Sequence, residues 1–124
     1  MVTSTSKLAF GDCFELFDQA LEDPIGARIP FTDKDSDRAY GAAMHFRVRC
    51  NRARSLDRQD NFKTFADGHP MHGRSQYDGL RLRVLRGEDE NDGTTTFWVY
   101  VEQIKLPGTV EALSALETDD ATTN

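Results

Sequence analysis

The spacing of hydrophobic residues near the start of the chain predicts a helix. Phe14, Phe17 and Leu21 recur at intervals that place them on one side of an α-helix. Asp12 is a suitable N-cap residue, and acidic residues follow it in the first turns, where they complement the helix dipole. Pro24 cannot continue the helix. We therefore expect an N-terminal helix between Asp12 and Pro24.

A second, longer helix is predicted from the capping residues at positions 35–37 to about Asn61. The alternative is a strand over residues 44–50, where apolar and polar residues alternate with a period of two. We prefer the helix, because residues 52–60 continue the helical pattern beyond the length of an ordinary strand. On a helical wheel the apolar side is narrow and built mostly of small residues: Ala39, Ala43, Phe46, Cys50 and Ala53.

An antiparallel hairpin is predicted in the second half of the chain. Two hydrophobic runs, residues 80–86 and 94–104, flank the acidic, glycine-containing segment GEDENDG. If Val84 pairs with Phe97, the same face also brings together Leu82 with Val99 and Leu80 with Val101. The opposite face then carries Arg81, Arg83, Trp98 and Tyr100.

The hairpin cannot stand alone, because two strands are only marginally stable in water. It needs a helical cover or a further strand. Residues 23–31 contain two prolines and a glycine around Ile25, Ile29 and Phe31 and predict an extended, partly buried connection. That third strand could come from residues 27–31 or from a neighbouring chain, and the second source would make the protein a homo-oligomer.

The remaining segments complete an α+β fold. Residues 107–117 predict a short C-terminal helix with Thr109 as its N-cap, and residues 1–7 and 118–124 predict flexible polar tails. At 124 residues the chain fits one domain, which we place at residues 8–117. Its order is an N-terminal helix, a long arginine-rich central helix, the hairpin with or without a third strand, and the closing helix.

The composition narrows the classes of protein that the chain can belong to. No apolar run approaches the roughly 20 residues that span a bilayer, and no export signal is recognisable at the start, so we expect a cytoplasmic protein without a membrane partner. Cys13 and Cys50 are too few for a disulfide framework. We expect both to be reduced and buried.

Charge is distributed unevenly along the chain. The formal net charge is -6, yet residues 38–86 hold 11 cations and 4 anions, a balance of +7. Residues 1–37 hold 3 cations and 8 anions, and residues 87–124 hold 1 and 9. Ten of the 11 central cations are arginines. A basic centre between acidic ends indicates an anionic partner for the centre.

Four polar residues of the predicted central helix form the first candidate site. Arg47, Asn51, Arg54 and Arg58 project in a line along one edge of the apolar side, whereas Arg38, Arg49 and Arg52 lie away from it with His45. Arginine suits phosphate, because its planar donors grip oxygens in pairs and stay charged. The alternative is a solvated face whose arginines pair with acids of the same chain, such as Asp57, Asp60, Glu88 or Glu90.

The outer face of the predicted hairpin is the second candidate site. With the pairing given above, Arg81 lies opposite Tyr100 and Arg83 opposite Trp98. Exposed aromatic residues among cations stack the bases of single-stranded nucleic acid. The same pairs could instead stabilise the sheet through cation-π contacts, or the central helix could cover this face.

Residues 66–79 form a loop rich in Gly, Pro, Asp and Ser that contains His69 and His72. These histidines are candidate metal ligands or a general base, but the further ligands of a zinc signature are missing. The chain also lacks a nucleophile elbow, a phosphate-binding glycine loop and the ligand spacing of a calcium loop. We expect neither catalysis nor a metal or other cofactor.

The leading hypothesis is a small non-enzymatic protein that presents its basic centre to DNA or RNA. The alternative is an acidic protein-interaction factor, such as an inhibitor or an assembly subunit encoded by a phage or mobile element, that uses arginine-carboxylate contacts. The two hypotheses differ in what they expect of Arg47, Arg54 and Arg58. Nucleic-acid binding requires them solvent-facing and unpaired, whereas the alternative has them buried against acids or a partner.

Overall fold

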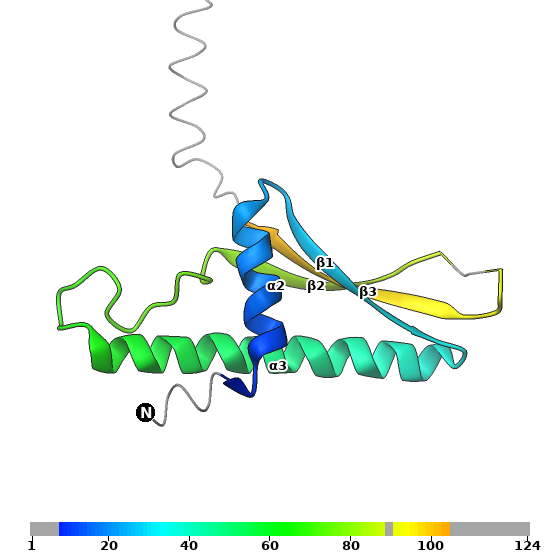
Figure 1. Ribbon diagram of the computed structural model, residues 1–124, viewed down its shortest axis with the longest axis horizontal. Helices are drawn as coiled ribbons and strands as arrows, with labels where there is room; N and C mark the ends of the chain where they lie inside the picture. Colours follow the sequence, from blue (N-terminus) through cyan, green and yellow to red (C-terminus); the bar gives the residue numbers. More distant parts are fainter. Residues whose placement is uncertain (1–7, 89–90, 105–124) are drawn as a thin grey trace, which may run out of the picture.

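The computed structural model describes residues 8–88 and 91–104 and has the expected α+β architecture. In Figure 1 the long helix runs the length of the molecule, the N-terminal helix crosses it, and the three strands lie together beside both helices. The predicted closing helix and the two predicted tails lie outside the described residues. The elements are α2 (Gly11–Glu22), β1 (Gly26–Asp33), α3 (Ser36–Thr64), β2 (Leu80–Arg86) and β3 (Thr95–Gln103).

The N-terminal helix α2 forms where the sequence predicts it, with two differences. Its N-cap position is Phe10, whose side chain makes no capping bond, whereas Asp12 lies within the first turn and accepts a hydrogen bond from the Cys13 N–H at 2.9 Å. Leu21, which the helical spacing places on the apolar side, is 39% exposed. The buried side is instead made by Cys13, Leu16, Phe17 and Ala20.

The long helix α3 confirms the helical interpretation of residues 44–50. Asp35 caps it by accepting hydrogen bonds from the N–H groups of Asp37 and Arg38. The helix ends at Thr64, slightly beyond the predicted end. Val48 is 59% exposed, whereas a strand would place it on the same side as the buried Phe46. The five predicted small and apolar positions are all buried, and Asp57 continues their line.

The sheet is antiparallel in the order β1-β3-β2, so the third strand comes from this chain. Val84 pairs with Val99 and Leu82 with Val101, a shift of two residues from the predicted pairing of Val84 with Phe97. A two-residue shift leaves every side chain on its original face, so the hydrophobic pattern alone cannot separate the two registers.

The two edges of the sheet differ. The Ile25 carbonyl accepts the N–H of Gln103, so every second residue of β1, counted from Ile25, forms backbone hydrogen bonds with β3. Pro30 lies between two of these residues, and its backbone groups face away from β3. Proline lacks an N–H, so this edge offers one donor fewer to another strand. On β2 the corresponding outward groups belong to Leu82 and Val84, and both keep their N–H and C=O.

Both helices pack on the same face of the sheet and enclose the core. Phe17 stacks on Tyr77 with ring centroids 4.9 Å apart, which joins α2 to the loop before β2. Cys13 and Cys50 are free and fully buried, as predicted. A hydrogen bond between the two thiols and their burial raise the pKa of Cys50. The central buried residues are Cys13, Phe17, Cys50, Leu80, Val99 and Val101.

Candidate binding site: an arginine groove and an aromatic face

Five of the predicted binding residues line one groove between α3 and the start of β2. The groove has a volume of about 450 Å³, and its walls also include Asp78, Leu80, Leu82 and Ile104. We call it the arginine groove, because four arginines face a single acid, Asp78. Its predicted members are Arg47, Asn51, Arg54, Arg58 and Arg81.

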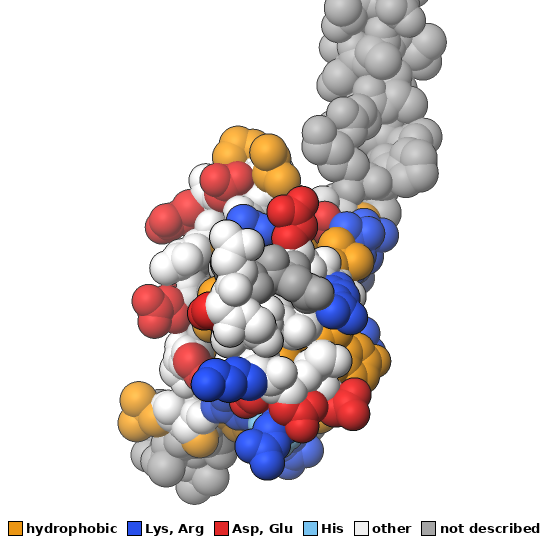
Figure 2. Space-filling model, turned by 90° about the vertical axis from the view of Figure 1, so that its right-hand side faces the viewer, with side chains coloured by type: hydrophobic (Ala, Val, Ile, Leu, Met, Phe, Trp, Pro, Cys, Tyr) orange, Lys and Arg blue, Asp and Glu red, His pale blue; other side chains and the backbone are white. Residues whose placement is uncertain are grey.

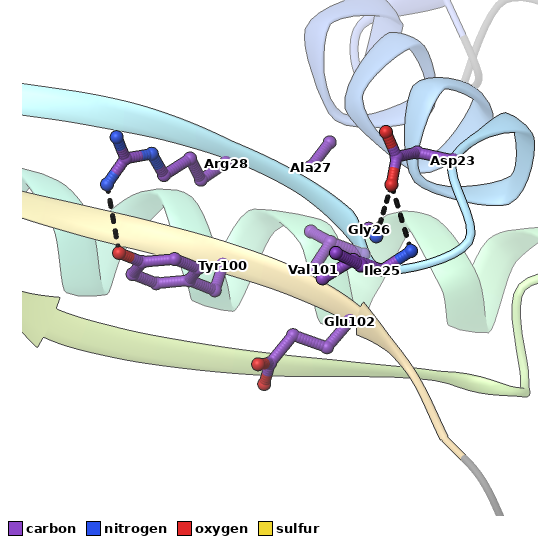
Figure 3. Close-up of a pocket in the computed structure, with 8 residues that line it drawn as sticks. All are labelled: Asp23, Ile25, Gly26, Ala27, Arg28, Tyr100, Val101 and Glu102. Carbon is purple, nitrogen blue, oxygen red and sulfur yellow. Dashed lines mark hydrogen bonds between the residues drawn. The ribbon is translucent and has the colours of Figure 1, made fainter.

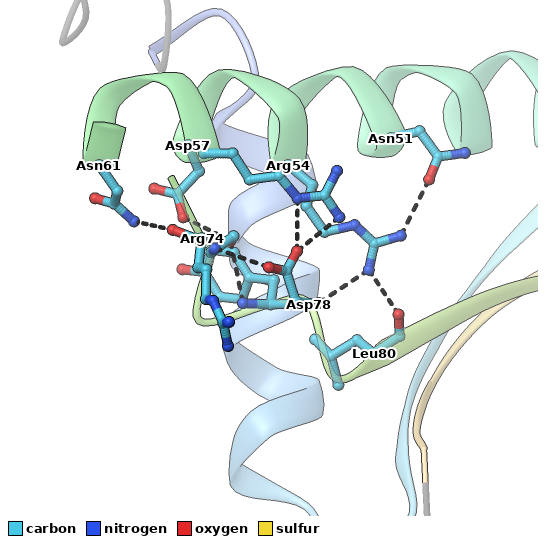
Figure 4. A network of polar contacts seen from close by, with 10 residues as sticks. Asn51, Arg54, Asp57, Asn61, Arg74, Asp78 and Leu80 are labelled. Atoms are coloured by element: carbon cyan, nitrogen blue, oxygen red, sulfur yellow. Dashed lines mark hydrogen bonds and ion pairs between the residues drawn. The ribbon is translucent and has the colours of Figure 1, made fainter. Parts of the chain in front are cut away.

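Arg54 is held by its own chain. Its Nη1 donates to the carbonyl oxygens of Tyr77 at 2.9 Å and Leu80 at 2.6 Å, and its Nη2 donates to Asn51 Oδ1 at 3.2 Å. Figure 4 shows the guanidinium reaching from α3 toward the chain that enters β2. Burial lowers the pKa of the Arg54 guanidinium from its usual value, but a guanidinium remains charged at neutral pH.

Arg58 is also engaged within the chain. Its Nε and Nη2 lie 2.7 and 2.6 Å from Asp78 Oδ1, and Asp78 Oδ2 accepts the Ser75 N–H at 3.0 Å. Burial acts to raise the pKa of Asp78, but these bonds and the arginine charges outweigh it and lower the pKa below 3.8. The buried Asp57 accepts a hydrogen bond from the Ser75 hydroxyl at 2.6 Å. This network fastens the loop before β2 to α3.

Arg47 and Arg81 are the groove arginines with the most freedom to meet a ligand. Arg47 is half-buried, and within residues 8–88 and 91–104 no group makes a hydrogen bond or ion pair with its guanidinium. Arg81 is 59% exposed and lies 3.4 Å from Glu102. Of the three helix arginines expected to be solvent-facing and unpaired on the nucleic-acid hypothesis, Arg47 alone is unpaired among the described residues, and it is half-buried.

The arginines predicted on the other side of α3 have different surroundings. Arg49 makes a two-pronged contact with Asp12, at 2.7 and 3.0 Å, and also donates to the Ala9 carbonyl at 2.9 Å. This contact joins α3 to α2, and its hydrogen bond lowers the pKa of Asp12. Arg52 is exposed and lines none of the described hollows.

The other predicted residues lie on the sheet face turned away from the helices. Tyr100 pairs with Arg83 on one side and with Arg28 on the other, whereas Trp98 lies between Leu85 and Pro30. Arg81 is therefore opposite Glu102 rather than Tyr100, and Arg83 is opposite Tyr100 rather than Trp98, because of the two-residue shift in register. The suggestion that the central helix covers this face is wrong. We call Arg28, Arg83, Leu85, Trp98 and Tyr100 the aromatic face.

Arg28 is a member of this face that sequence reasoning missed. Its guanidinium carbon lies 3.7 Å from the centre of the Trp98 ring, and its Nη1 donates to the Tyr100 hydroxyl at 3.0 Å. Figure 3 shows Arg28 and Tyr100 side by side on neighbouring strands. The available signal was the alternation around Arg28: its apolar neighbours Ala27 and Ile29 point inward, so Arg28 points outward.

A small hollow of about 340 Å³ adjoins the aromatic face at the Tyr100 end (Figure 3). Its two acids are already occupied. Asp23 Oδ1 accepts the N–H groups of Ile25 and Gly26, at 2.8 and 3.3 Å. Glu102 turns toward β2, where its Oε1 lies 2.8 Å from Arg83 Nε. The hollow therefore extends the aromatic face without adding a free acid to it.

The arginine groove and the aromatic face meet at β2. Arg81 lines the groove, and Arg83, two residues further along the strand, belongs to the aromatic face. The molecule is not uniformly basic: the end that carries the hairpin tip shows positive, negative and hydrophobic side chains intermixed (Figure 2). Five of the 11 cations of the basic centre therefore lie on the two sides of β2: Arg47, Arg54, Arg58, Arg81 and Arg83.

His69 and His72 have structural contacts in the loop before β2. His69 stacks on Phe65 with ring centroids 4.4 Å apart, and its Nδ1 accepts the Met71 N–H at 3.0 Å. His72 Nδ1 lies 2.7 Å from the Phe65 carbonyl oxygen. In the part of the chain that the structure describes, no three His, Cys, Asp or Glu side chains are placed to hold a metal ion.

Comparisons with protein-family models, with curated proteins and with solved structures find no match for this chain. Among the described helices, none combines the length and the apolar character that crossing a membrane requires.

Proposed function

We propose that this is a small non-enzymatic binding protein for single-stranded nucleic acid, with phosphates held in the arginine groove and bases stacked on the aromatic face. The observation that carries the proposal is the continuity of these two surfaces across β2, between Arg81 and Arg83. A single strand that crosses β2 places its backbone on one side and its bases on the other.

The chemistry of each surface supports this assignment. Arg47 and Arg81 offer planar donors at a partly enclosed position, where charge-assisted hydrogen bonds to phosphate oxygens are strong. Trp98 and Tyr100 are half-buried, so part of each side chain is exposed to solvent. Stacking of a base on an aromatic ring contributes about 1 to 3 kcal/mol and tolerates any sequence.

A second candidate function is binding of an acidic protein partner. One observation favours it: Arg58 pairs with the carboxylate of Asp78, as that hypothesis expects, whereas Arg54 contacts backbone carbonyls. Arg, Trp and Tyr are also the residues most enriched at the energetic centres of protein interfaces.

The decisive experiment uses the single tryptophan as an internal reporter. Labelled single- and double-stranded DNA and RNA are titrated with the protein between 50 and 200 mM salt while Trp98 emission is recorded. We expect single strands to bind more tightly and to quench Trp98. If about four phosphates are contacted, single-strand affinity should fall roughly 50-fold over this range.

Arg47→Ala and Arg52→Ala form a matched pair for the same titration. Both arginines lie on α3, but Arg47 lines the groove and Arg52 does not. Arg47→Ala should weaken binding and reduce the salt slope by about 0.7, the value for one single-strand phosphate. Arg52→Ala should leave the slope unchanged. Absence of binding and of Trp98 quenching at 50 mM salt would overturn the proposal.

A further inference from the structure

The outer edge of β2 carries backbone groups that the nucleic-acid proposal does not use. The Gly79 carbonyl accepts the Ile104 N–H, so the odd-numbered residues of β2 form the hydrogen bonds to β3. The N–H and C=O groups of Leu82 and Val84 therefore point away from the sheet, about 7 Å apart along the strand. In the part of the chain that the structure describes, no group bonds to them.

The backbone groups next to this open stretch are already bonded. The Leu80 carbonyl accepts Arg54 Nη1 at 2.6 Å (Figure 4), and the Leu80 N–H donates to the Tyr77 carbonyl at 3.1 Å. On the other edge of the sheet, Pro30 interrupts the outward N–H groups of β1. The open stretch of β2 is thus better suited than β1 to pair with a further strand.

A strand paired with β2 at this stretch turns one of its faces toward the arginine groove. Side chains directly opposite each other in an antiparallel pair lie on the same face. The side chain opposite Leu82 therefore points toward α3, because Leu82 packs against the core and lines the groove. Arg47 lines the same groove and has no polar partner among the described residues. A carboxylate on this face of the added strand can bind Arg47.

The charge of β2 favours an acidic strand over a second copy of this chain. β2 has the sequence LRLRVLR, with three arginines and no acid. Two copies paired antiparallel about Arg83 would place this residue opposite its own counterpart, and like charges in that position are destabilising. Arg81 and Arg83 share one carboxylate oxygen, Glu102 Oε1, at 3.4 and 2.8 Å. Carboxylates of an acidic strand would give these two arginines further partners.

We infer that the outer edge of β2 binds an extended, acidic segment of a partner protein, which adds a strand to the three-stranded sheet. The backbone of the segment pairs with Leu82 and Val84, and a carboxylate on its inner face binds Arg47. The inference gives the second candidate function a binding mode and does not rest on nucleic-acid binding. Because both ligands use Arg47, a bound segment excludes nucleic acid from the arginine groove.

The first test measures binding of a probe peptide to the full-length protein. The probe is a labelled peptide of five Glu-Thr repeats, whose threonines favour extended structure. Its charge control is the corresponding Lys-Thr peptide. We expect the acidic probe to bind with a dissociation constant below about 1 mM and the basic control not to bind. Absence of binding by the acidic probe, or equal binding of the two peptides, would overturn the inference.

Hydrogen exchange measured by NMR shows whether the bound probe pairs with the edge. At a probe concentration about ten times the dissociation constant, exchange of the Leu82 and Val84 amides should slow roughly 10-fold, because about one molecule in eleven remains free. The Arg28 amide, which faces outward on β1, should be unaffected. Bound probe without slowing at Leu82 and Val84, or with equal slowing at Arg28, contradicts edge pairing.

Val84→Pro and Val84→Ala form a matched pair for the same titration. Proline removes an outward N–H and leaves the bonds to β3, whereas alanine shortens the side chain and keeps the N–H. Val84→Pro should weaken probe binding about 5-fold or more, and Val84→Ala by less than about 2-fold. Equal affinities of the two folded variants would refute the pairing; if Val84→Pro does not fold, the exchange measurement decides.

Arg47→Ala and Arg52→Ala test the carboxylate contact. Arg47→Ala should weaken probe binding, and Arg52→Ala, outside the groove, should not. The same titrations separate the inference from the proposed function. Probe binding without nucleic-acid binding keeps the inference and overturns the nucleic-acid function. Nucleic-acid binding without protection of Leu82 and Val84 by the probe keeps that function and overturns the inference.

Discussion

Replacing Arg54 by alanine should destabilise the fold far more than replacing Arg47, although both lie on the same helix and line the same groove. Arg54 donates to two backbone carbonyls and to Asn51, whereas Arg47 has no polar partner among the described residues. Arg54→Ala leaves the carbonyls of Tyr77 and Leu80 without this donor. It therefore loosens the connection between α3 and the start of β2.

The magnitude follows from the partners of Arg54. A hydrogen bond from a charged donor contributes about 1.5 to 3 kcal/mol. Both carbonyl oxygens are only partly buried, so in Arg54→Ala water can replace part of the hydrogen bonding that is lost. We therefore expect Arg54→Ala to lower the free energy of unfolding by about 2 to 3 kcal/mol. Arg47→Ala should change it by less than about 0.5 kcal/mol.

Urea unfolding followed by circular dichroism measures both values, and thermal unfolding gives a check. At roughly 4 °C per kcal/mol, Arg54→Ala should lower Tm by about 8 to 12 °C. Arg54→Lys keeps a cation but loses the forked geometry of the guanidinium, so its free energy of unfolding should lie between those of the wild type and Arg54→Ala. If Arg54→Ala and Arg47→Ala have the same stability within about 0.5 kcal/mol, the structural role assigned to Arg54 is refuted.

Three further predictions concern stability. Gly26→Ala should lower the free energy of unfolding by more than about 2 kcal/mol, because φ is +137° and the added Cβ would overlap a β3 carbonyl. Gly68→Ala, with φ +94° but open space around the added Cβ, should lower it by about 1 kcal/mol. Urea unfolding measures both values. Tyr77→Phe should cost about 1 to 2 kcal/mol in the same assay, because it removes a 2.6 Å hydrogen bond to the Asp18 carboxylate and keeps the ring. The pKa of Asp78 is lowered in the fold, so the ionised carboxylate stabilises the folded protein above pH 3.8, and this stabilisation is lost as the pH falls through and below that value. Asp78→Asn should therefore reduce the fall in Tm at acid pH in thermal unfolding.

The sequence predicts the helices well because their signals are local. Asp35 and the small residues of α3 act through neighbours within a few positions, so capping and periodicity are enough to locate the helix. The strand β1 is harder to predict, because Pro30 argues against a strand unless the strand lies at an edge. Whether a strand is at an edge is a property of the whole sheet.

The candidate site is predicted in part for the same reason. Helical spacing is enough to place Arg47, Arg54 and Arg58 in one line, but not to distinguish those engaged within the chain from those free to bind. Two of the three partners of Arg54 are backbone carbonyls more than 20 residues away, and backbone carbonyls leave no mark in a sequence. Arg28 belongs to the aromatic face because β1 pairs with β3, and this pairing depends on the whole sheet.

The unequal edges of the sheet limit how copies of this protein can join through their strands. Growth of a continuous intermolecular sheet needs two receptive edges on each molecule, one to extend and one to be extended. Pro30 blunts the β1 edge, whereas β2 keeps the outward groups of Leu82 and Val84. Pairing through β2 would use the same edge on both partners and would close a dimer, which would leave only the β1 edges, blunted by Pro30, to continue a sheet.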